Sequence, residues 1–208
     1  PDSLLEKLNA YVANGGTLVA TFKTAFANEN IKVSHETQPH ILHNCMGIKY
    51  QQFTFPKNVG LTGKIISEDW DGQVKVFMEL LETEGAEVLA SYDHYNWKEY
   101  AAITRNQYGK GTAVYIGCMT DEQTLENLLK EVLLNAQIEI IDQYFPVIVR
   151  KGTNDFGKTV RFYLNYSDQE QSVKYSYEDG IELLSGDNVD KEQILSIPAW
   201  DLKIIENE

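Results

Sequence analysis

Hydrophobic residues at the start of the chain recur with the period of a helix. Those that fall on one helical face are Leu4, Leu5, Leu8, Tyr11 and Val12. Ser3 and Glu6 have the S-x-x-E spacing of a capping box, which predicts where this helix begins. Asn14-Gly15-Gly16 predicts its end, because glycine readily adopts the left-handed conformation of a helix C-terminus. Residues 17–22 are rich in β-forming residues, so a strand is expected there, and helix and strand together make half of a βαβ unit.

The middle of the chain alternates between strand-like runs and polar turns, after a long irregular stretch over residues 23–63. Within that stretch, the turn Thr37-Gln38-Pro39-His40 precedes a short predicted helix through residues 41–46. The predicted strands are 74–81, 87–92, 101–105 and 112–116. Thr120 and Gln123 have the capping-box spacing and predict a second helix. Its expected buried stripe consists of Leu125, Leu128, Leu129, Val132 and Leu133.

The pattern changes after about Asn135, where short apolar or alternating runs are separated by Gly, Asn and Asp and no helical period remains. These runs are 138–151, 159–166, 171–177, 181–184 and 193–197. They predict a small antiparallel β-sandwich. We therefore expect two domains, an α/β domain over residues 1–137 and a β-sandwich domain over residues 138–208.

The fold class predicted by this order of elements is α/β. We expect a truncated Rossmann- or flavodoxin-like domain, similar to amidotransferase domains, followed by the small sandwich. The strand that should precede the first helix is missing, so the chain is expected to begin inside a domain and to leave one sheet edge in need of cover. Pro1-Asp2 also begins without an initiator Met, a basic segment or an apolar signal region, which indicates a boundary within a longer protein.

Composition and charge narrow the possible partners. The 208 residues are 43% hydrophobic and carry a formal net charge of −13. No apolar run approaches the ~20 residues that cross a bilayer. Nucleic acids and anionic membranes demand clustered Lys and Arg, so neither is expected as a partner, whereas neutral sugars are compatible with this charge. Cys45 and Cys118 form no CxxC motif, so we expect free, semi-buried thiols and a reduced, cytoplasmic location.

Residues 84–117, EGAEVLASYDHYNWKEYAAITRNQYGKGTAVYIG, carry the most specific pattern in the chain. Their spacing, "GAEVLA.Y" and then "A.TRN.YGKG.A.Y.G", resembles the middle domain of glycoside hydrolase family 42 β-galactosidases. Pro39, Leu42, Gly47 and Ile48 keep the outline of the family's "PG.L..L.GI" segment, with His40 at the usual Gly. Residues 160–167 resemble the "F.LN.S" strand of the family's C-terminal domain, and residues 197–206 resemble its last strand.

This resemblance implies a catalytic TIM barrel in front of the region, which takes roughly 250 residues. It further implies hydrolysis of terminal β-D-galactosides such as lactose, with retention and without an obligatory cofactor. The family's homotrimers pack this middle domain against neighbouring subunits and the barrel mouths, so the expected partners are the protein's own barrel and those subunits. No segment resembles the barrel strands that carry the two catalytic Glu residues. We therefore assign no catalytic or substrate-binding residue and expect the chain alone to be inactive.

Two other candidate sites have weaker patterns. His35, His40, His43 and Cys45 lie close together in sequence, but their spacing fits no usual zinc motif, so no metal site is predicted. Gly109-Lys110-Gly111 could suggest a phosphate cradle, yet a strand follows it where a dinucleotide fingerprint needs a helix N-terminus. A hairpin turn is the better interpretation.

The loop after residue 91 is the one segment whose composition favours binding: Tyr92, Asp93, His94, Tyr95, Asn96 and Trp97. Aromatic faces stack on sugars, and Asp, His and Asn bond hydroxyl groups, but aromatic residues at a subunit contact would look the same. Subunit interface, sugar contact and plain loop packing therefore all stay open. The rival function is a free-standing carbohydrate-binding module. A third, an independent α/β hydrolase or amidotransferase-like enzyme, lacks a visible nucleophile.

Overall fold

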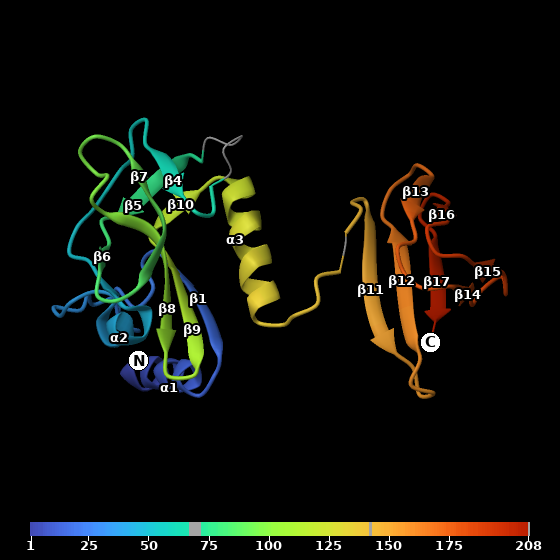
Figure 1. The fold of residues 1–208 in the computed structure, drawn as a ribbon, viewed down its shortest axis with the longest axis horizontal. Coiled ribbons are helices and arrows are strands. Elements are labelled where there is room, and N and C mark those ends of the chain that lie inside the picture. The colour runs from blue at the N-terminus through green and yellow to red at the C-terminus, as the bar shows by residue number, and fades with distance from the viewer. Residues whose placement is uncertain (67–71, 142, 208) are drawn as a thin grey trace. The chain divides into compact units, whose positions relative to one another are not determined.

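The computed structural model describes residues 1–66, 72–141 and 143–207. The chain folds into two compact units, Pro1–Ile138 and Glu139–Glu208. Figure 1 shows helices and strands mixed in the first unit and only strands labelled in the second.

The elements of the first unit are α1 (Asp2–Ala13), β1 (Thr17–Thr21), the 3₁₀ helix η1 (His40–Leu42), α2 (His43–Met46), β2 (Ile48–Lys49), β3 (Phe53–Thr54), β4 (Gly60–Gly63), β5 (Val74–Glu79), β6 (Glu82–Thr83), β7 (Glu87–Asp93), β8 (Ala101–Tyr108), β9 (Gly111–Ile116), β10 (Cys118–Thr120) and α3 (Glu122–Asn135). Those of the second unit are β11 (Val147–Thr153), β12 (Thr159–Asn165), β13 (Gln171–Lys174), β14 (Gly180–Glu182), β15 (Asn188–Val189), β16 (Ile194–Ile197) and β17 (Leu202–Asn207).

Five strands of the first unit form a mixed sheet in the order β1-β9-β8-β7-β4. Strands β1 and β9 are parallel, and the other neighbours are antiparallel. A second, antiparallel sheet has the order β10-β5-β3, and β2 pairs with β6. A flavodoxin-like sheet is built of parallel strands. Among the described strands only β1 and β9 are parallel neighbours. This one pair supports the predicted flavodoxin-like class.

Both helix starts were predicted wrongly, by two residues for α1 and by one residue for α3. Helix α1 begins at Asp2 after Pro1, and no side chain bonds its N-terminus, so Ser3 lies inside the helix and forms no capping box. Helix α3 is capped by Asp121 rather than by Thr120, and the Asp121 carboxylate accepts from the Thr124 backbone N–H at 2.8 Å. Asp is among the strongest N-caps.

Two buried clusters hold the first unit together. One joins helix α1 to β9 through Val12, Ala113 and Tyr115, and the other joins the mixed sheet to β5, β10 and α3. Cys45 and Cys118 are free and fully buried, not semi-buried as expected. Burial raises the pKa of Cys45 to about 11 and that of Cys118 to about 12, so both behave as inert apolar groups.

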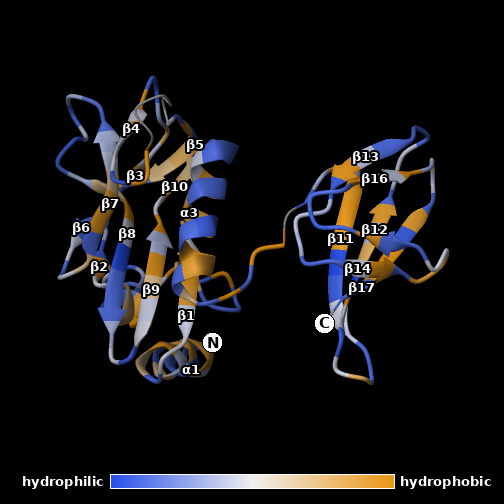
Figure 2. Ribbon diagram, turned by 45° about the vertical axis from the view of Figure 1, so that its right-hand side comes forward, coloured by the Kyte–Doolittle hydropathy of each residue, from blue (hydrophilic) through white to orange (hydrophobic). Residues whose placement is uncertain are grey.

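The second unit consists of two antiparallel sheets, β11-β12-β17-β14-β15 and β13-β16, which share one core. Strand β11 is hydrophobic in its first half and hydrophilic in its second (Figure 2), because only Val147 and Val149 face the core. Strand β11 begins at Val147, nine residues later than the predicted strand 138–151. The segment before it holds a tight turn in which Tyr144 and Val147 exchange backbone hydrogen bonds.

Asn165 explains the "F.LN.S" pattern. Its side chain is buried and donates to the carbonyls of Gln169, Ile197 and Pro198 at 2.8 to 3.1 Å, while its oxygen accepts from the N–H and hydroxyl of Ser167. One amide thus ties the end of β12 to two loops.

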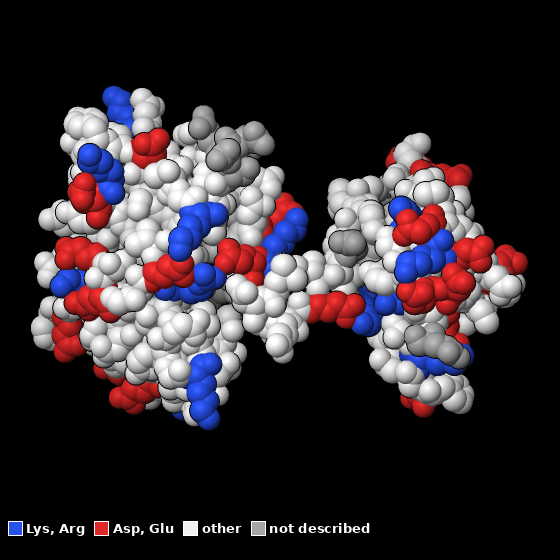
Figure 3. All heavy atoms as spheres, viewed as in Figure 1, with Lys and Arg blue, Asp and Glu red and all other residues white. Residues whose placement is uncertain are grey.

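The charged surface shows no single-sign region on the visible face, where acidic and basic side chains are interspersed (Figure 3). No helix of the described residues is both long and apolar enough to span a membrane.

Substituting Asn165→Ala should lower the free energy of unfolding of the second unit by about 2–3 kcal/mol, because the buried Ile197 carbonyl and the carbonyls of Gln169 and Pro198 lose their donor. Denaturant unfolding measures this, with Asn188→Ala on exposed β15 as the control. Equal stability of the two variants would contradict the structural role of Asn165.

Candidate interaction site

A buried carboxylate lies at the centre of the first unit. Glu79, at the end of β5, is 0% exposed. Its Oε1 accepts from the Lys23 backbone N–H at 2.9 Å, and its Oε2 accepts from the Tyr115 hydroxyl at 2.9 Å. Its carbonyl accepts from the Tyr92 hydroxyl at 2.6 Å. One residue therefore connects β5 with β7, β9 and the end of β1.

Burial raises the pKa of Glu79, and the bonds from Lys23 N–H, Tyr50 and Tyr115 together with the Lys23 charge oppose that rise. A carboxylate without exposed surface cannot reach a substrate. Glu79 is thus a structural group and not a catalytic acid or base.

The Lys23 side chain lies among phenylalanine rings. Its ammonium is 3.2 Å from the ring centroid of Phe53, 3.6 Å from that of Phe26 and 4.9 Å from that of Phe77. Such cation–π contacts are worth about 0.5–2 kcal/mol. Desolvation lowers the pKa of Lys23, and the charge of Glu79 acts in the opposite direction.

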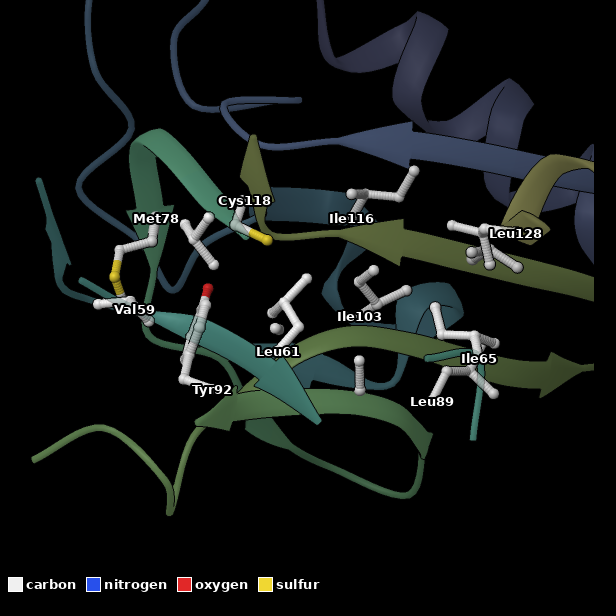
Figure 4. Packing of buried hydrophobic residues seen from close by; sticks show 14 of the residues in the cluster. Val59, Leu61, Ile65, Met78, Leu89, Tyr92, Ile103, Ile116, Cys118 and Leu128 are labelled. Carbon is white, nitrogen blue, oxygen red and sulfur yellow. The ribbon is translucent and has the colours of Figure 1, made fainter. Parts of the chain in front are cut away.

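The predicted binding loop is split by the structure. Tyr92 belongs to the core, where it lies among Val59, Leu61 and Met78 (Figure 4), and with 0% exposure it is unavailable for a subunit or sugar contact. This part of the predicted contact set is wrong, because Tyr92 lies within strand β7 on the same face as the buried Ala90.

The remaining loop residues form a small ring cluster. The His94 imidazole lies 4.7 Å from the Tyr95 ring and stacks on Trp97 at 6.3 Å with an interplanar angle of 19°. Tyr95 is 82% exposed, Asp93 is also exposed, and Trp97 packs against the core. An exposed tyrosine on a stacked histidine can contact either a protein or a sugar, so geometry alone leaves both roles open.

The residues of β8 and β9 that resemble the family pattern attach helices to the sheet. Arg105 binds Glu87 of β7 at 2.9 Å and Glu131 of α3 at 2.6 Å. Asn106 donates to the Cys45 carbonyl at the end of α2, at 2.9 Å. The two residues thus fix two different helices to the same strand.

The Gly-Lys-Gly segment is the hairpin turn that its sequence predicted, since Tyr108 pairs with Gly111 across it. It also contacts the end of α1: Lys110 N–H donates to the Ala13 carbonyl, and Thr112 N–H donates to that of Gly16. A Cβ on Gly111 would lie 2.2 Å from the Val12 carbonyl oxygen, so only glycine fits. The whole motif is therefore structural.

His40 and His43 bond other groups of the chain. The described part of the chain holds no group of three or more His, Cys, Asp or Glu side chains that could ligate an ion. His40 instead lies 3.2 Å from the Ser34 hydroxyl on one ring nitrogen and 3.2 Å from the Asp2 carboxylate on the other. His43 bonds the His40 carbonyl.

Comparison with known proteins identifies both units. Residues 1–139 match the profile of the β-galactosidase trimerisation domain, and residues 147–207 match that of the β-galactosidase C-terminal domain. The chain belongs to glycoside hydrolase family 42. The resemblance inferred from residues 84–117 is thus confirmed, and the chain corresponds to the non-catalytic C-terminal region of these enzymes.

Individual family 42 relatives extend well beyond this chain. β-Galactosidase LacA of Lactobacillus acidophilus is 28% identical over 204 residues, which are 97% of this chain and 30% of that protein. β-Galactosidase LacZ of Heyndrickxia coagulans is 34% identical over 169 residues, 81% of this chain and 25% of that protein. The β-galactosidase from Bacillus circulans sp. alkalophilus shares the fold, with a TM-score of 0.83 at 24% identity over 98% of this chain and 31% of that one.

Sequence reasoning missed the Glu79 and Lys23 group. A signal was present, because Glu79 is a lone carboxylate inside the apolar run Val76–Leu81. A charge in such a run indicates either an exposed edge or a buried, partnered group.

Gly111→Ala should lower the free energy of unfolding by about 2–4 kcal/mol, because the added methyl meets backbone atoms that cannot move aside. Gly60→Ala is the control, since a Cβ there finds its nearest neighbours at 3.5 Å. Thermal unfolding of both variants measures this difference in stability. A Gly111→Ala protein as stable as the control would refute the close contact.

Glu79→Gln should change how stability depends on pH. A carboxyl whose pKa is raised by folding contributes most below its unfolded value near 4.5 and loses that contribution as pH rises through the folded value. The stability of the unsubstituted protein should therefore fall relative to Glu79→Gln as pH rises above about 4.5. Exposed Glu82→Gln is the control, and a pH-independent difference for Glu79→Gln would refute the raised pKa of Glu79.

Proposed function

We propose that this chain is the assembly and support region of a β-galactosidase that hydrolyses terminal β-D-galactosides, lactose among them, with retention of configuration and without an obligatory cofactor. The observation that carries the proposal is the consecutive match of residues 1–139 and 147–207 to the trimerisation and C-terminal domains of one enzyme family. In this proposal the first unit joins subunits into a homotrimer in the cytoplasm. The second unit, the β-sandwich, is the C-terminal domain.

The boundaries that we propose are residues 1–137 for the trimerisation domain and 138–208 for the sandwich. The first of these is a truncated flavodoxin-like domain, supported by the order α1, β1 and by the parallel pairing of β1 with β9. Its partners are the catalytic barrel of the full protein and the neighbouring subunits.

The structure supports a scaffold rather than a catalyst. The conspicuous motif fixes helices α1, α2 and α3 to one hairpin, and the most buried carboxylate is inaccessible. Within the loop, Asp93, His94, Tyr95 and Trp97 stay candidates for a contact with a neighbouring subunit or with sugar.

The experiment that tests this function uses the product of the full coding sequence. Light scattering should give the mass of a trimer, and proton NMR of a cleaved aryl β-galactoside should show the β-anomer of galactose first. The 208-residue chain should release no galactose at the same concentration. A monomeric full protein, or α-galactose as first product, would contradict the proposal.

The carbohydrate-binding alternative is tested on the same protein. Calorimetric titration of the 208-residue chain with galactose, lactose and galacto-oligosaccharides should give no binding heat. Saturable heat that disappears in Tyr95→Ala would establish the loop as a sugar site instead.

A further inference from the structure

The turn that ends helix α1 contains a chemically reactive pair of residues. Asn14 is the C-cap residue of α1, its side chain is exposed, and it is the only asparagine of the 208-residue sequence that precedes a glycine. Glycine has no side chain, so nothing on Gly15 hinders the approach of its backbone nitrogen to the side-chain amide of Asn14. The pair therefore meets the sequence requirement for spontaneous deamidation.

Deamidation of this pair needs no reactant other than water. The Gly15 nitrogen attacks Cγ of Asn14, a C–N bond forms, the bond from Cγ to Nδ2 breaks, and ammonia leaves with the proton of the Gly15 nitrogen. Water then adds to either carbonyl of the cyclic imide and breaks the bond from that carbonyl to nitrogen. The products are aspartate and isoaspartate at position 14, both of which carry a negative charge at neutral pH.

The folded turn keeps the reacting atoms apart. Asn14 has φ −87° and ψ 3°, so the Gly15 nitrogen is eclipsed with the backbone nitrogen of Asn14, whereas ring closure requires it to be eclipsed with Cβ. The Gly15 N–H donates to the Val12 carbonyl at 2.9 Å, and Nδ2 of Asn14 donates to the Ala10 carbonyl at 2.9 Å. Both hydrogen bonds have to break before the nitrogen reaches Cγ.

Contacts from two sides keep this turn closed. The Lys110 N–H donates to the Ala13 carbonyl at 3.0 Å, and the Thr112 N–H donates to the Gly16 carbonyl at 3.1 Å. The Tyr11 ring covers Gly16 so closely that a Cβ on Gly16 would lie 2.3 Å from it. Helix ends open locally with a free energy that depends on such contacts. The hairpin of β8 and β9 and the Tyr11 ring therefore control access to the reactive geometry.

We propose that Asn14 is a site of spontaneous deamidation that reacts only when the C-terminal turn of α1 opens. The folded protein keeps the rate low, and any loosening of the contact between α1 and the hairpin raises it. Because the products do not revert to asparagine, position 14 records how long this turn has been open during the life of the protein. The inference goes beyond the proposed assembly function and does not depend on it.

The modified protein should hold α1 less firmly against its sheet. Either product places a negative charge at the C-terminus of the helix, where the helix dipole disfavours it, and the last turn of α1 has no basic residue. Either product also removes the donor to the Ala10 carbonyl. Isoaspartate adds a methylene to the backbone before Gly15, which moves the Gly16 carbonyl from its position opposite the Thr112 N–H. Deamidation thus weakens the attachment that had prevented it.

The test follows deamidation of the full-length protein by peptide mass spectrometry during incubation in mildly alkaline buffer, with and without guanidinium chloride. The peptide that contains position 14 should convert at least about tenfold faster in the unfolded protein, which corresponds to about 1.4 kcal/mol of opening free energy in the folded one. Asn188 is the internal control. It is exposed, but the branched Val189 follows it, so its peptide should remain unmodified in both states.

Two substitutions test the control by neighbouring contacts in the folded protein. Gly111→Ala displaces the hairpin from α1, and Gly60→Ala is its control. Tyr11→Ala uncovers Gly16 at a 53% exposed position, and Leu4→Ala is its control, because Leu4 is 51% exposed at the other end of α1. Gly111→Ala and Tyr11→Ala should each deamidate faster at position 14 than the matched control. Tyr11→Ala keeps the test available if Gly111→Ala does not fold.

Three results would overturn the inference. The first is an equal rate at position 14 in folded and unfolded protein, because the turn would then give no protection. The second is an unmodified peptide in the unfolded protein, which would show that the pair does not react. The third is a rate in folded Tyr11→Ala and Gly111→Ala no higher than in their controls. None of these readouts depends on the oligomeric state, so a monomeric full-length protein would contradict the proposed function alone.

Discussion

The bonds to the buried Glu79 carboxylate are the interaction on which the first unit depends. Each oxygen has a donor, one on the Lys23 backbone and one on Tyr115, and the carbonyl takes a third from Tyr92. A buried charge is tolerated only when it is partnered, so losing one of these donors within the folded unit would leave the carboxylate unsatisfied. The same bonds fix Lys23, and Lys23 in turn orders three phenylalanine rings.

The hairpin of β8 and β9 is the second organising feature. Its Arg105, Asn106 and Gly-Lys-Gly turn hold one helix each, so a single hairpin sets the positions of α3, α2 and α1. Neither feature performs chemistry on a substrate. Both produce rigidity, which a subunit contact needs because ordering a flexible surface on binding costs free energy.

Much of this could be predicted from sequence. Alternation and turn residues gave most strands, and the Gly-Lys-Gly turn was predicted correctly because a strand follows it directly. The family followed from the spacing of residues 84–117. The cap of α3 was misplaced because Thr120 and Asp121 are both good caps, and only the geometry of the Thr124 N–H distinguishes them.

Other features depend on contacts between residues that are distant in sequence. Tyr92 stood at the end of its predicted strand and was grouped with the loop, because the pattern alone does not report that Val59, Leu61 and Met78 pack around its ring. The rings of Phe26, Phe53 and Phe77 meet around Lys23 although they come from distant segments, and the pairing of β3 with β5 brings Phe53 beside Phe77. No local pattern reports such a contact, since it is a property of the pairing.

Hydrogen–deuterium exchange on the unsubstituted protein and on Tyr115→Phe tests the central claim most directly, because the substitution removes one donor of the buried Glu79 carboxylate. The account predicts faster exchange of the amides of β5, β7 and β9 in Tyr115→Phe, while the amides of β12 in the second unit remain unchanged. Equal exchange of β5, β7 and β9 in both proteins would show that the first unit does not depend on these bonds.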